Sequence, residues 1–293
     1  MIHLIDASVY VFRAWFSLPD SMTDADGNPV NAFYGYARFL GDFLERTRAP
    51  HVVVAFDESL TTSYRNEIYP EYKANRDSPP AELVRQFALC RALTRAFGIT
   101  EYASPEYEAD DIIGTLATAA HRDGTPVCIV TRDKDLAQLI REGDQYWDFA
   151  ADKRMAYTDV ETRFGVPAEA IADLLALTGD AVDNIPGVPG IGPKTAAALL
   201  QHFGTLDAIY ERLSEVAQLP IRGAGKLGVR LEQHAEQARL SRQLTVIAED
   251  VPIPATSQSM QRQPFDLTAV NALYDELGFG ERLREQAARI AAL

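Results

Sequence analysis

Apolar and polar positions divide the chain into two parts with different periods. In the first part, short runs of β-branched and aromatic residues alternate with longer segments whose apolar residues recur at helical spacing. The runs that we predict to be strands are residues 2–6, 51–57, 99–103 and 126–131. Because strands that alternate with helices form βαβ units, this pattern predicts an α/β fold with a mostly parallel sheet through about residue 150.

Helical spacing is clearest in two segments of the first part, and it dominates the second part. Residues 31–47 and 81–98 are predicted helices, and Gly98 closes the second one. After Tyr157 the strand signal fades, and short helical patterns broken by glycine and proline continue to about residue 245. The chain therefore has a second, helical region.

The C-terminal part begins with an irregular connection. Residues 248–266 contain several prolines and serines, which favour a loop. One last predicted helix follows at residues 267–278. We find neither an internal repeat nor a low-complexity block in the sequence.

Composition restricts the class of protein. The chain has 293 residues, 47% of them hydrophobic, which is enough for a sizeable core. Its apolar runs are strand-sized and no leader-like segment opens it, so we expect a cytoplasmic protein with no membrane contact. The isolated cysteines, Cys90 and Cys128, are expected to be reduced core thiols. A formal net charge of -14 argues against a nucleic-acid partner unless basic residues gather locally.

Acidic residues follow the predicted strands at one edge of the sheet. In open parallel sheets, sites form outside the carboxyl ends of the strands, so residues distant in sequence converge there. We expect two further carboxylates to join this edge from the start of the helical region. The acidic residues concerned are Asp6, Asp57, Glu108, Asp110, Asp111, Asp133, Asp135, Asp180 and Asp183.

The spacing of these acids suggests pairs. Glu108 and Asp111 are three residues apart and would share one face of a helix, whereas Asp133 and Asp135 would point the same way in an extended segment. Each pair could hold one ion. Taken singly, such residues are more often helix caps, turn residues or partners of a helix dipole.

Convergence favours a metal site over these ordinary roles. Many carboxylates around one pocket would repel each other and raise one another's pKa unless cations neutralised them. Ligands that are all oxygen select Mg²⁺ or Mn²⁺ over zinc. Two such ions form a clamp that activates water and stabilises the leaving oxygen in phosphodiester hydrolysis. The cluster therefore predicts a metal-dependent nuclease or phosphatase.

A glycine-rich loop lies a few residues after Asp180 and Asp183. Its glycines would let backbone approach a surface closely, and Pro193 begins a helix whose free N–H groups face the loop. Such a hairpin can present backbone amides to a phosphate without reading any base. Alone, the loop could simply join two helices. The three glycines are Gly187, Gly190 and Gly192.

Other phosphate-binding and nucleophilic motifs are absent from the sequence. The five histidines are scattered, no serine lies in a G-x-S-x-G turn, and neither a Walker loop nor a Rossmann glycine motif occurs. We therefore expect phosphate to be bound by metals. A basic and aromatic stretch, residues 64–76, has the mixture that steers a nucleic-acid strand and stacks its bases, or it is an ordinary solvated amphipathic segment.

Four motifs carry a resemblance to a known family. They read "VVAFDES", "YEADDIIGTLA", "TRDKDLAQLI" and "LTGDAVDNIPGVPGIGPKTAAALLQHFGTLDAIY". They resemble the 5′-nuclease domain that begins bacterial DNA polymerase I, and its stand-alone relatives, the flap endonucleases and 5′-3′ exonucleases. The resemblance covers nearly the whole chain, and the last motif is highly specific.

The resemblance implies a PIN-like fold, in which a mostly parallel sheet is flanked by helices. It implies a nuclease domain over residues 1–157, with a helical arch at about residues 60–97. It also implies a helical DNA-binding region over residues 158–293, with a helix-three-turn-helix of the helix-hairpin-helix type at about residues 174–204. The arch would surround a single 5′ end.

By the same resemblance, particular residues have particular roles. Lys73 and Arg76 would act on the scissile phosphate. The first Mg²⁺ would be held by Asp6, Asp57, Glu108 and Asp110. The second would be held or positioned by Asp111, Asp133, Asp135, Asp180 and Asp183, and Mn²⁺ could substitute. DNA would be contacted by Arg65, Tyr72, Gly187, Gly190, Gly192, Lys194 and Thr195. A K⁺ ion would be held by the carbonyls of Ile185, Val188 and Ile191. The duplex would be followed by Lys194, Arg222, Lys226 and Arg230.

The sequence thus predicts a Mg²⁺-dependent, structure-selective 5′-nuclease, with 5′-3′ exonuclease and flap endonuclease activity on branched, nicked, gapped or RNA-primed DNA. We expect a monomer that receives DNA from a separate polymerase and passes it to a ligase. The alternatives are a PIN-type ribonuclease, which would lack the glycine hairpin, and a DNA-binding module without catalysis. Two residues depart from the family pattern: Ala7, which could alter the turn beside Asp6, and Arg132, which could contact a phosphate or partly neutralise the second metal site.

Overall fold

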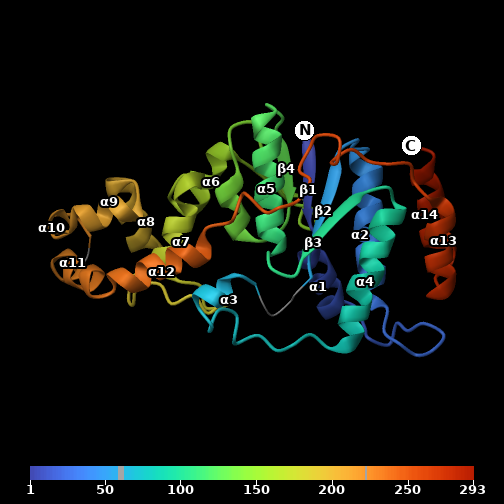
Figure 1. Cartoon of the computed structure of the whole chain (residues 1–293), viewed down its shortest axis with the longest axis horizontal. Coiled ribbons are helices and arrows are strands. Elements are labelled where there is room, and N and C mark those ends of the chain that lie inside the picture. The colour runs from blue at the N-terminus through green and yellow to red at the C-terminus, as the bar shows by residue number, and fades with distance from the viewer. Residues whose placement is uncertain (59–62, 222) are drawn as a thin grey trace.

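The computed structural model describes residues 1–58, 63–221 and 223–293. Within these ranges, six strands form one sheet in the order β3-β2-β1-β4-β5-β6 (Figure 1). All neighbouring pairs are parallel except β5 and β6, which are antiparallel. The strands are β1 (Ile2–Asp6), β2 (Val52–Asp57), β3 (Thr100–Ser104), β4 (Val127–Val130), β5 (Gln145–Asp148) and β6 (Lys153–Ala156).

The four strands that the sequence predicts are confirmed, with ends shifted by a residue at most. The structure adds β5 and β6, which the apolar pattern did not reveal. Strand β6 is a short edge strand in which Met155 is the single buried residue, so it lacks the apolar run of an interior strand. Strand β5 is only four residues long.

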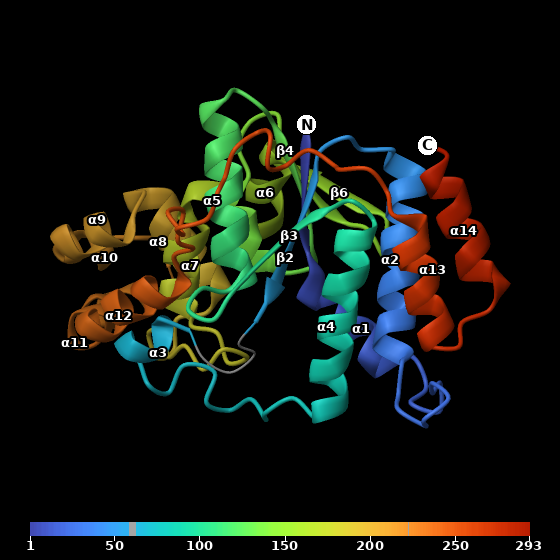
Figure 2. The same ribbon diagram turned by 45° about the vertical axis from the view of Figure 1, so that its right-hand side comes forward.

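Helices cover both faces of the sheet (Figures 1 and 2). On one face lie α1 (Ala7–Ser17), α2 (Asn31–Thr47) and α4 (Ala81–Ala96), and on the other lies α5 (Ala109–Arg122). Helix α2 has the predicted bounds. Helix α4 ends two residues before Gly98, whose φ of 71° suits the turn that follows the helix. The two cysteines are buried and free, as predicted.

The C-terminal end contains two helices, so the prediction of one last helix is wrong. After the irregular connection, α13 (Leu267–Glu276) and α14 (Glu281–Ala291) pack outside α4 and α2 (Figure 2). Helix α14 is strongly charged, but Leu283, Ala287 and Ile290 are buried at helical spacing. Its polar side also contributes, since Arg289 pairs with Glu45 of α2 at 2.6 Å. Both helices thus pack on the α/β half of the molecule.

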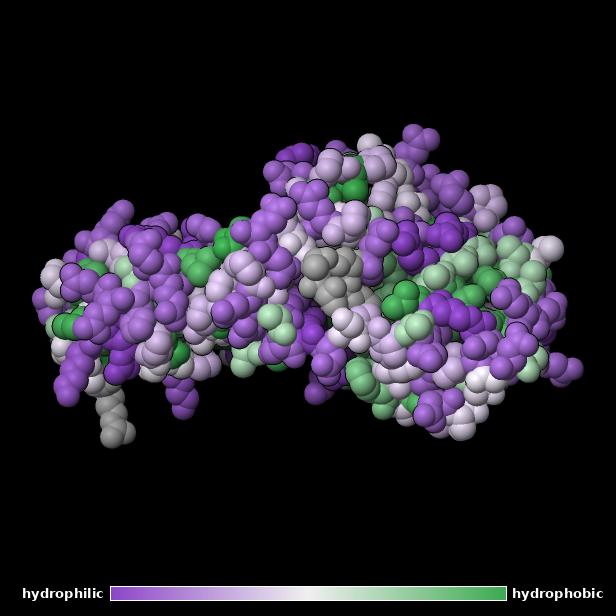
Figure 3. Space-filling model, turned by 60° about the horizontal axis from the view of Figure 1, so that its bottom comes forward, coloured by the Kyte–Doolittle hydropathy of each residue, from purple (hydrophilic) through white to green (hydrophobic). Residues whose placement is uncertain are grey.

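The middle of the chain forms a narrower helical lobe beside the sheet (Figure 1). Figure 3, in which the carboxyl edge of the sheet comes toward the viewer, shows a wide and a narrow part whose visible surface is mainly hydrophilic. Along the chain, three helical elements come before the lobe: η1 (Lys134–Leu139), α6 (Tyr157–Phe164) and η2 (Ala168–Ala170). It contains α7 (Ile171–Thr178), α8 (Pro193–Phe203), α9 (Leu206–Glu211), α10 (Leu213–Val216), α11 (Ala224–Gln233) and α12 (Ala235–Thr245).

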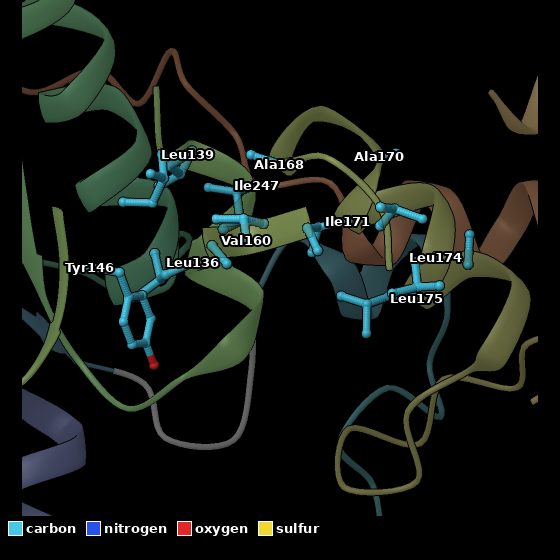
Figure 4. Packing of buried hydrophobic residues seen from close by; sticks show 14 of the residues in the cluster. Leu136, Leu139, Tyr146, Val160, Ala168, Ala170, Ile171, Leu174, Leu175 and Ile247 are labelled. Atoms are coloured by element: carbon cyan, nitrogen blue, oxygen red, sulfur yellow. The ribbon is translucent and has the colours of Figure 1, made fainter. Parts of the chain in front are cut away.

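The lobe and the sheet share one hydrophobic core. Leu136 and Leu139 of η1 belong to the same buried cluster as Ile171 and Leu175 of α7, and Ile247 lies between them (Figure 4). Because one buried cluster continues from the sheet into the lobe, it fixes the lobe relative to the sheet.

The segment between β2 and α4 differs from the predicted helical arch. In the described part of residues 60–97, only α3 (Arg65–Ile68) and α4 are helical, and residues 59–62 are outside the described ranges. Most of α4 packs against the sheet, where Leu83 and Leu93 are buried. Only residues 63–80 therefore lie over the carboxyl edge of the sheet, and most of them are irregular. We call residues 63–80 the covering segment. None of the helices in the described ranges has the length and apolar character needed to cross a bilayer.

Candidate active site

A cavity of about 530 Å³ lies at the carboxyl edge of the sheet. The ends of β1 and β2, the loop after β4 and the first turn of α5 surround it, as expected for an open parallel sheet. Its walls hold six of the nine predicted acidic residues. These are Asp6, Asp57, Glu108, Asp110, Asp133 and Asp183.

Backbone and hydroxyl groups hold the carboxylates in place. Asp6 ends β1, caps α1, and accepts a hydrogen bond of 2.8 Å from Thr131 Oγ1. Asp57 accepts one of 2.9 Å from the N–H of Ala109, at the start of α5. Asp6 and Asp57 are the last residues of two neighbouring parallel strands. This position at the ends of the strands brings the two acids together although they are distant in the sequence.

The crowded carboxylates are electrostatically costly without added cations. Burial raises the pKa of Asp6 to about 7, and the nearby charge of Asp57 adds to this. Burial also raises the pKa of Asp110 well above its usual range, with repulsion from Asp133 and Asp6 as further causes. The pKa of Asp57 and that of Asp133 are raised by burial in the same way. A bound divalent cation would relieve this cost.

Basic side chains from the covering segment partly neutralise the acids. Lys73 Nζ lies 2.7 Å from Glu108 Oε1 and 3.8 Å from Asp183 Oδ2, and Arg76 pairs with Asp183. Burial alone would raise the pKa of Glu108, but the charges of Lys73 and Arg65 outweigh it and lower that pKa. The predicted pair Lys73 and Arg76 thus lies in the cavity beside the carboxylates.

Asp135 and Asp180 lie just outside the walls of the cavity. One oxygen of Asp135 is buried without a hydrogen-bond partner among the described residues, and burial together with Asp133 raises the pKa of Asp135 to about 8. Asp180 pairs with Lys134 at 2.7 Å, which lowers its pKa although burial opposes the change. Asp133 caps η1 by accepting the N–H of Asp135, so the two acids do not share an extended segment as predicted.

The donor set fits hard divalent cations. In the described ranges, no three acidic, histidine or cysteine side chains converge as a metal-ligand group. Lys73, Arg76 and Lys134 instead pair with Glu108, Asp183 and Asp180. A cation with oxygen ligands would give the buried oxygen of Asp135 a partner. It would also stabilise the charged form of the carboxylates whose pKa is raised here.

The structure corrects the predicted roles of Asp111 and Arg65. Asp111 is fully buried, and its oxygens accept hydrogen bonds of 2.7 and 2.8 Å from Arg65. It also accepts the N–H of Glu108, so Glu108 and Asp111 form a capping box for α5 and do not hold one ion between them. Arg65 itself is 3% exposed. Neither residue reaches the cavity, and both hold the covering segment to α5.

Tyr72 is also unavailable for stacking on DNA. Its ring is 3% exposed and packs with Ile185 and Leu244. Its hydroxyl donates to Glu108 at 3.1 Å. The aromatic spacing that predicted a strand-binding surface instead reflects a small core under the covering segment.

The glycine hairpin connects α7 to α8, and its glycines serve different purposes. Gly187 is buried with a φ of 58°, and a side chain there would lie 2.2 Å from the backbone N of Gly179. The predicted DNA contact at Gly187 is therefore wrong, since its close approach is internal. Gly190 and Gly192 are exposed, and a side-chain carbon at Gly192 would meet nothing within 4 Å. Gly192 is therefore open to a ligand, whereas a side-chain carbon at Gly190 would lie 2.6 Å from Arg230 Nη1.

Other predicted hairpin residues surround this open side. Lys194 is exposed and Thr195 half-buried on the first turn of α8. Lys226 and Arg230 are exposed on α11, and Arg230 Nη1 reaches the carbonyl of Gly190 at 3.4 Å. Arg222 lies outside the described residues.

The three carbonyls of the predicted K⁺ site belong to this hairpin. Those of Ile185 and Val188 each accept one backbone hydrogen bond, from Asp180 and Ile191. A carbonyl oxygen has two lone pairs, so each retains one for a cation. These two carbonyls can therefore accept a further partner.

Two family models match adjoining parts of the chain. The model of the 5′-3′ exonuclease N-terminal resolvase-like domain matches residues 1–165, and that of the 5′-3′ exonuclease C-terminal SAM fold matches residues 166–268. The chain belongs to the 5′-3′ exonuclease family. Its fold is accordingly a resolvase-like α/β domain followed by a SAM-like helical domain.

Relatives and solved structures agree with this family assignment. The chain is 40% identical to DNA polymerase I of Rhizobium leguminosarum over 90% of its length, and 38% identical to that of Bacillus subtilis over 97%. It spans only 26% and 32% of those proteins. It resembles the T5 5′-exonuclease bound to divalent zinc (TM-score 0.65, 21% identity, 99% of both chains) and the catalytic core of Rad2 with DNA (TM-score 0.66, 16% identity, 98% of this chain and 90% of that one). These structural likenesses show a shared fold.

In this exonuclease-family chain, helix α1 contributes cavity residues that the sequence did not single out. Phe12 and Phe16 line the cavity one helical turn apart, together with Arg13, and Phe16 is 80% exposed. Phe12 is half-buried. Two phenylalanines at i and i+4, just after a strand that ends in an acid, are the available sequence signal. Ser8 also lines the cavity, and its hydroxyl accepts the N–H of Asp57 at 3.4 Å.

The two departures from the family pattern have clear consequences in the structure. Ala7 is buried and begins α1 without a positive φ, so the turn beside Asp6 accommodates it. Arg132 lines the cavity, but its Nε pairs with Asp148 at 3.3 Å, on the side away from the acids. It therefore does not neutralise the acids by a direct ion pair.

Proposed function

We propose that the protein is a metal-dependent, structure-selective 5′-nuclease with 5′-3′ exonuclease and flap endonuclease activity. Its substrates are branched, nicked, gapped or RNA-primed DNA. The observation that supports this most strongly is the set of six carboxylates in one cavity, with pKa values of several raised by burial and mutual repulsion. An enzyme without cations there would hold a large uncompensated negative charge.

Two Mg²⁺ ions fit the donor set, and Mn²⁺ shares its preference for oxygen. The first would be held by Asp6, Asp57, Glu108 and Asp110. The second would be held or positioned by Asp133, Asp135, Asp180 and Asp183. When bound, such a pair lowers the pKa of a bound water, so that it can attack the phosphorus as hydroxide, and neutralises charge on the leaving oxygen.

The protein's own cations would handle the phosphate. Lys73 and Arg76 now pair with Glu108 and Asp183, and both side chains line the cavity. Once metals neutralise these carboxylates, the two cations are free to bind the oxygens of the scissile phosphate. Charge-assisted hydrogen bonds of this kind are strongest where charge develops during the reaction.

The hairpin would set substrate choice. Gly190, Gly192 and Lys194 offer backbone N–H groups on the exposed side of the hairpin, and the ammonium of Lys194 and the hydroxyl of Thr195 lie on the same turn. A K⁺ ion on the carbonyls of Ile185, Val188 and Ile191 would add a positive charge for a duplex phosphate. Because these contacts touch only the DNA backbone, selectivity would come from shape rather than from sequence.

The protein would act as a cytoplasmic monomer that receives DNA from a polymerase and leaves a nick for a ligase. The direct test uses a 5′-labelled flap duplex and the matching single strand, each with Mg²⁺ and with EDTA. We expect metal-dependent cleavage near the flap junction and little cleavage of the single strand. Cleavage of the single strand alone would remove the role of the hairpin. Tight flap binding without cleavage would instead identify a DNA-binding module.

A further inference from the structure

A second cavity, of about 270 Å³, adjoins the catalytic one. Arg132 lines both, so the two cavities meet at this side chain. We call it the β5–β6 pocket. Its lining residues are Arg132, Tyr146, Asp148, Ala151, Lys153, Arg154, Met155 and Arg163.

The β5–β6 pocket is strongly positive in an acidic chain. Four of its lining residues are basic and one is acidic, whereas the whole chain carries a formal charge of -14. Arg132 pairs loosely with Asp148 at 3.3 Å. Lys153 and Arg163 have no carboxylate within 4.0 Å among the described residues. The lining therefore has cationic groups that the described part of the protein does not neutralise.

Regular secondary structure positions these cations. In the antiparallel hairpin, Arg154 faces Trp147 and Lys153 faces Asp148. The guanidinium of Arg154 lies 3.9 Å from the centre of the buried Trp147 ring, a favourable cation–π contact, and donates to Gln145 Oε1. The charge of Arg154 is therefore held against the sheet, and Arg132, Lys153 and Arg163 are the cations that can meet a ligand in the pocket. Arg163 comes from a different element, the end of α6. A pocket built from a hairpin and a helix is more precisely shaped than a flexible basic tail.

An ordinary explanation accounts for only part of this pocket. Lysine and arginine on an exposed edge strand prevent pairing with another sheet, and β6 is such a strand. That role explains Lys153 and Arg154. It does not explain why Arg132 and Arg163 converge on the same cavity from outside the edge strand. Like charges brought together raise the free energy unless an anion joins them.

We propose that the β5–β6 pocket binds a backbone phosphate of the DNA strand whose scissile phosphodiester lies in the catalytic cavity. The proposal rests on the proposed nuclease function. Phosphate suits the pocket because guanidinium groups bind phosphate oxygens in a bidentate manner. Arg132 joins the two cavities, so a single strand can occupy both. The pocket then fixes how far the strand extends past the cleavage point.

The test compares a pocket variant with a charge-matched control. The pocket variant is Lys153→Gln with Arg163→Gln, because neither residue lines the catalytic cavity. The control is Arg122→Gln with Arg282→Gln, which removes two exposed positive charges elsewhere. Binding of a 5′-flap duplex is measured in EDTA over a range of salt concentrations, and cleavage is measured in Mg²⁺.

We expect the pocket variant to bind the flap duplex roughly tenfold more weakly than wild type. Its plot of log affinity against log salt should be shallower by about 1, because the variant no longer neutralises the one phosphate in the pocket. The control should bind like wild type. Lys153→Arg with Arg163→Lys should retain the wild-type slope, because it keeps both charges. Equal slopes for the pocket variant and the control would overturn the proposal.

Two further measurements separate the possible outcomes. A flap with a 5′-hydroxyl end should lose as much affinity as one with a 5′-phosphate, and a loss confined to the phosphorylated flap would overturn the backbone assignment in favour of a terminal phosphate. Wild-type cleavage of the flap tests the nuclease function separately. If wild type cleaves while the pocket variant matches the control, the pocket proposal fails and the nuclease function stands.

Discussion

The ammonium of Lys73 lies 2.7 Å from a carboxylate oxygen of Glu108, joining the covering segment to the first turn of α5. This contact brings a cation to the place where a phosphate would be cleaved. Burial disfavours the charge on Lys73, but Glu108 and Asp183 outweigh burial and raise its pKa. Lys73 is therefore a permanently charged group at neutral pH.

Lys73→Ala should slow cleavage far more than it weakens binding. A donor aimed at charge that develops in the reaction is worth about a hundredfold to a thousandfold in rate. Single-turnover cleavage in Mg²⁺ and flap affinity in EDTA measure the two effects. Arg282→Ala, which removes an exposed positive charge of α14, is the control for lost charge. A loss of rate no larger than the loss of affinity would contradict the proposed role.

Asp135→Ala should abolish cleavage and leave duplex binding largely intact. Asp135 has a buried oxygen with no partner among the described residues, as expected for a group that awaits a cation. Asp20→Ala removes an exposed acid far from the cavity lining and should be neutral. Turnover by the Asp135 variant equal to that of wild type would exclude the two-metal assignment.

Arg65→Ala should destabilise the protein rather than impair DNA contact. The change leaves Asp111 charged and fully buried without its partner, which costs about 3 to 5 kcal/mol. Urea unfolding measures this loss. Replacing both partners, Arg65→Met with Asp111→Leu, should recover much of it. An unfolding free energy unchanged by Arg65→Ala, with weaker flap binding, would restore Arg65 as a DNA contact.

Gly187→Ala should destabilise the protein, whereas Gly192→Ala should leave its stability unchanged. An alanine at Gly187 would be forced into a left-handed conformation and against the backbone of Gly179, at a cost of at least about 1 to 2 kcal/mol. Gly192 has a φ of -95° and open space beside it, so alanine there should leave stability unchanged. Thermal unfolding and flap binding, measured on both variants, test this. Weaker binding with normal stability at Gly192→Ala would support close approach of DNA to the hairpin.

His3 should make stability depend on pH on the acidic side. Burial lowers its pKa from 6.5 to about 4, and Arg154 adds to this. Between these values the unfolded chain binds a proton that the folded chain does not, so the stabilisation is complete above pH 6.5 and is lost as pH falls toward 4. The loss amounts to at most about 3 kcal/mol. Urea unfolding of wild type and His3→Leu over this range should show a shallower dependence in the variant, and equal slopes would exclude His3 as the cause.

The sequence predicted the central strands and the acidic edge because both depend on local patterns. A strand that ends in an acidic residue can be recognised from the sequence. Parallel pairing of β1 and β2 then brings Asp6 and Asp57 to the same edge of the sheet. The sequence did not reveal that Asp111, Arg65 and Tyr72 are buried, and the reason is the same for all three. A charged or aromatic residue has the same identity whether it faces a cavity or is buried, and only tertiary contacts distinguish the two.

The missed elements lacked a local signal of the usual strength. Strand β6 has one buried residue, and its pairing with β5 comes from the hairpin turn rather than from an apolar run. Helix α14 is short of apolar residues because polar contacts to α2 supply part of its packing. Both also lie outside the motifs that identify the family.

The hydrophobic cluster shared by η1, α7 and Ile247 has a consequence for how the chain can be divided (Figure 4). The two family models meet between residues 165 and 166, yet the core continues across that point. A fragment cut there would expose Leu136, Leu139 and Val160 to water and would tend to aggregate. The two halves are therefore separate units of classification but one unit of folding.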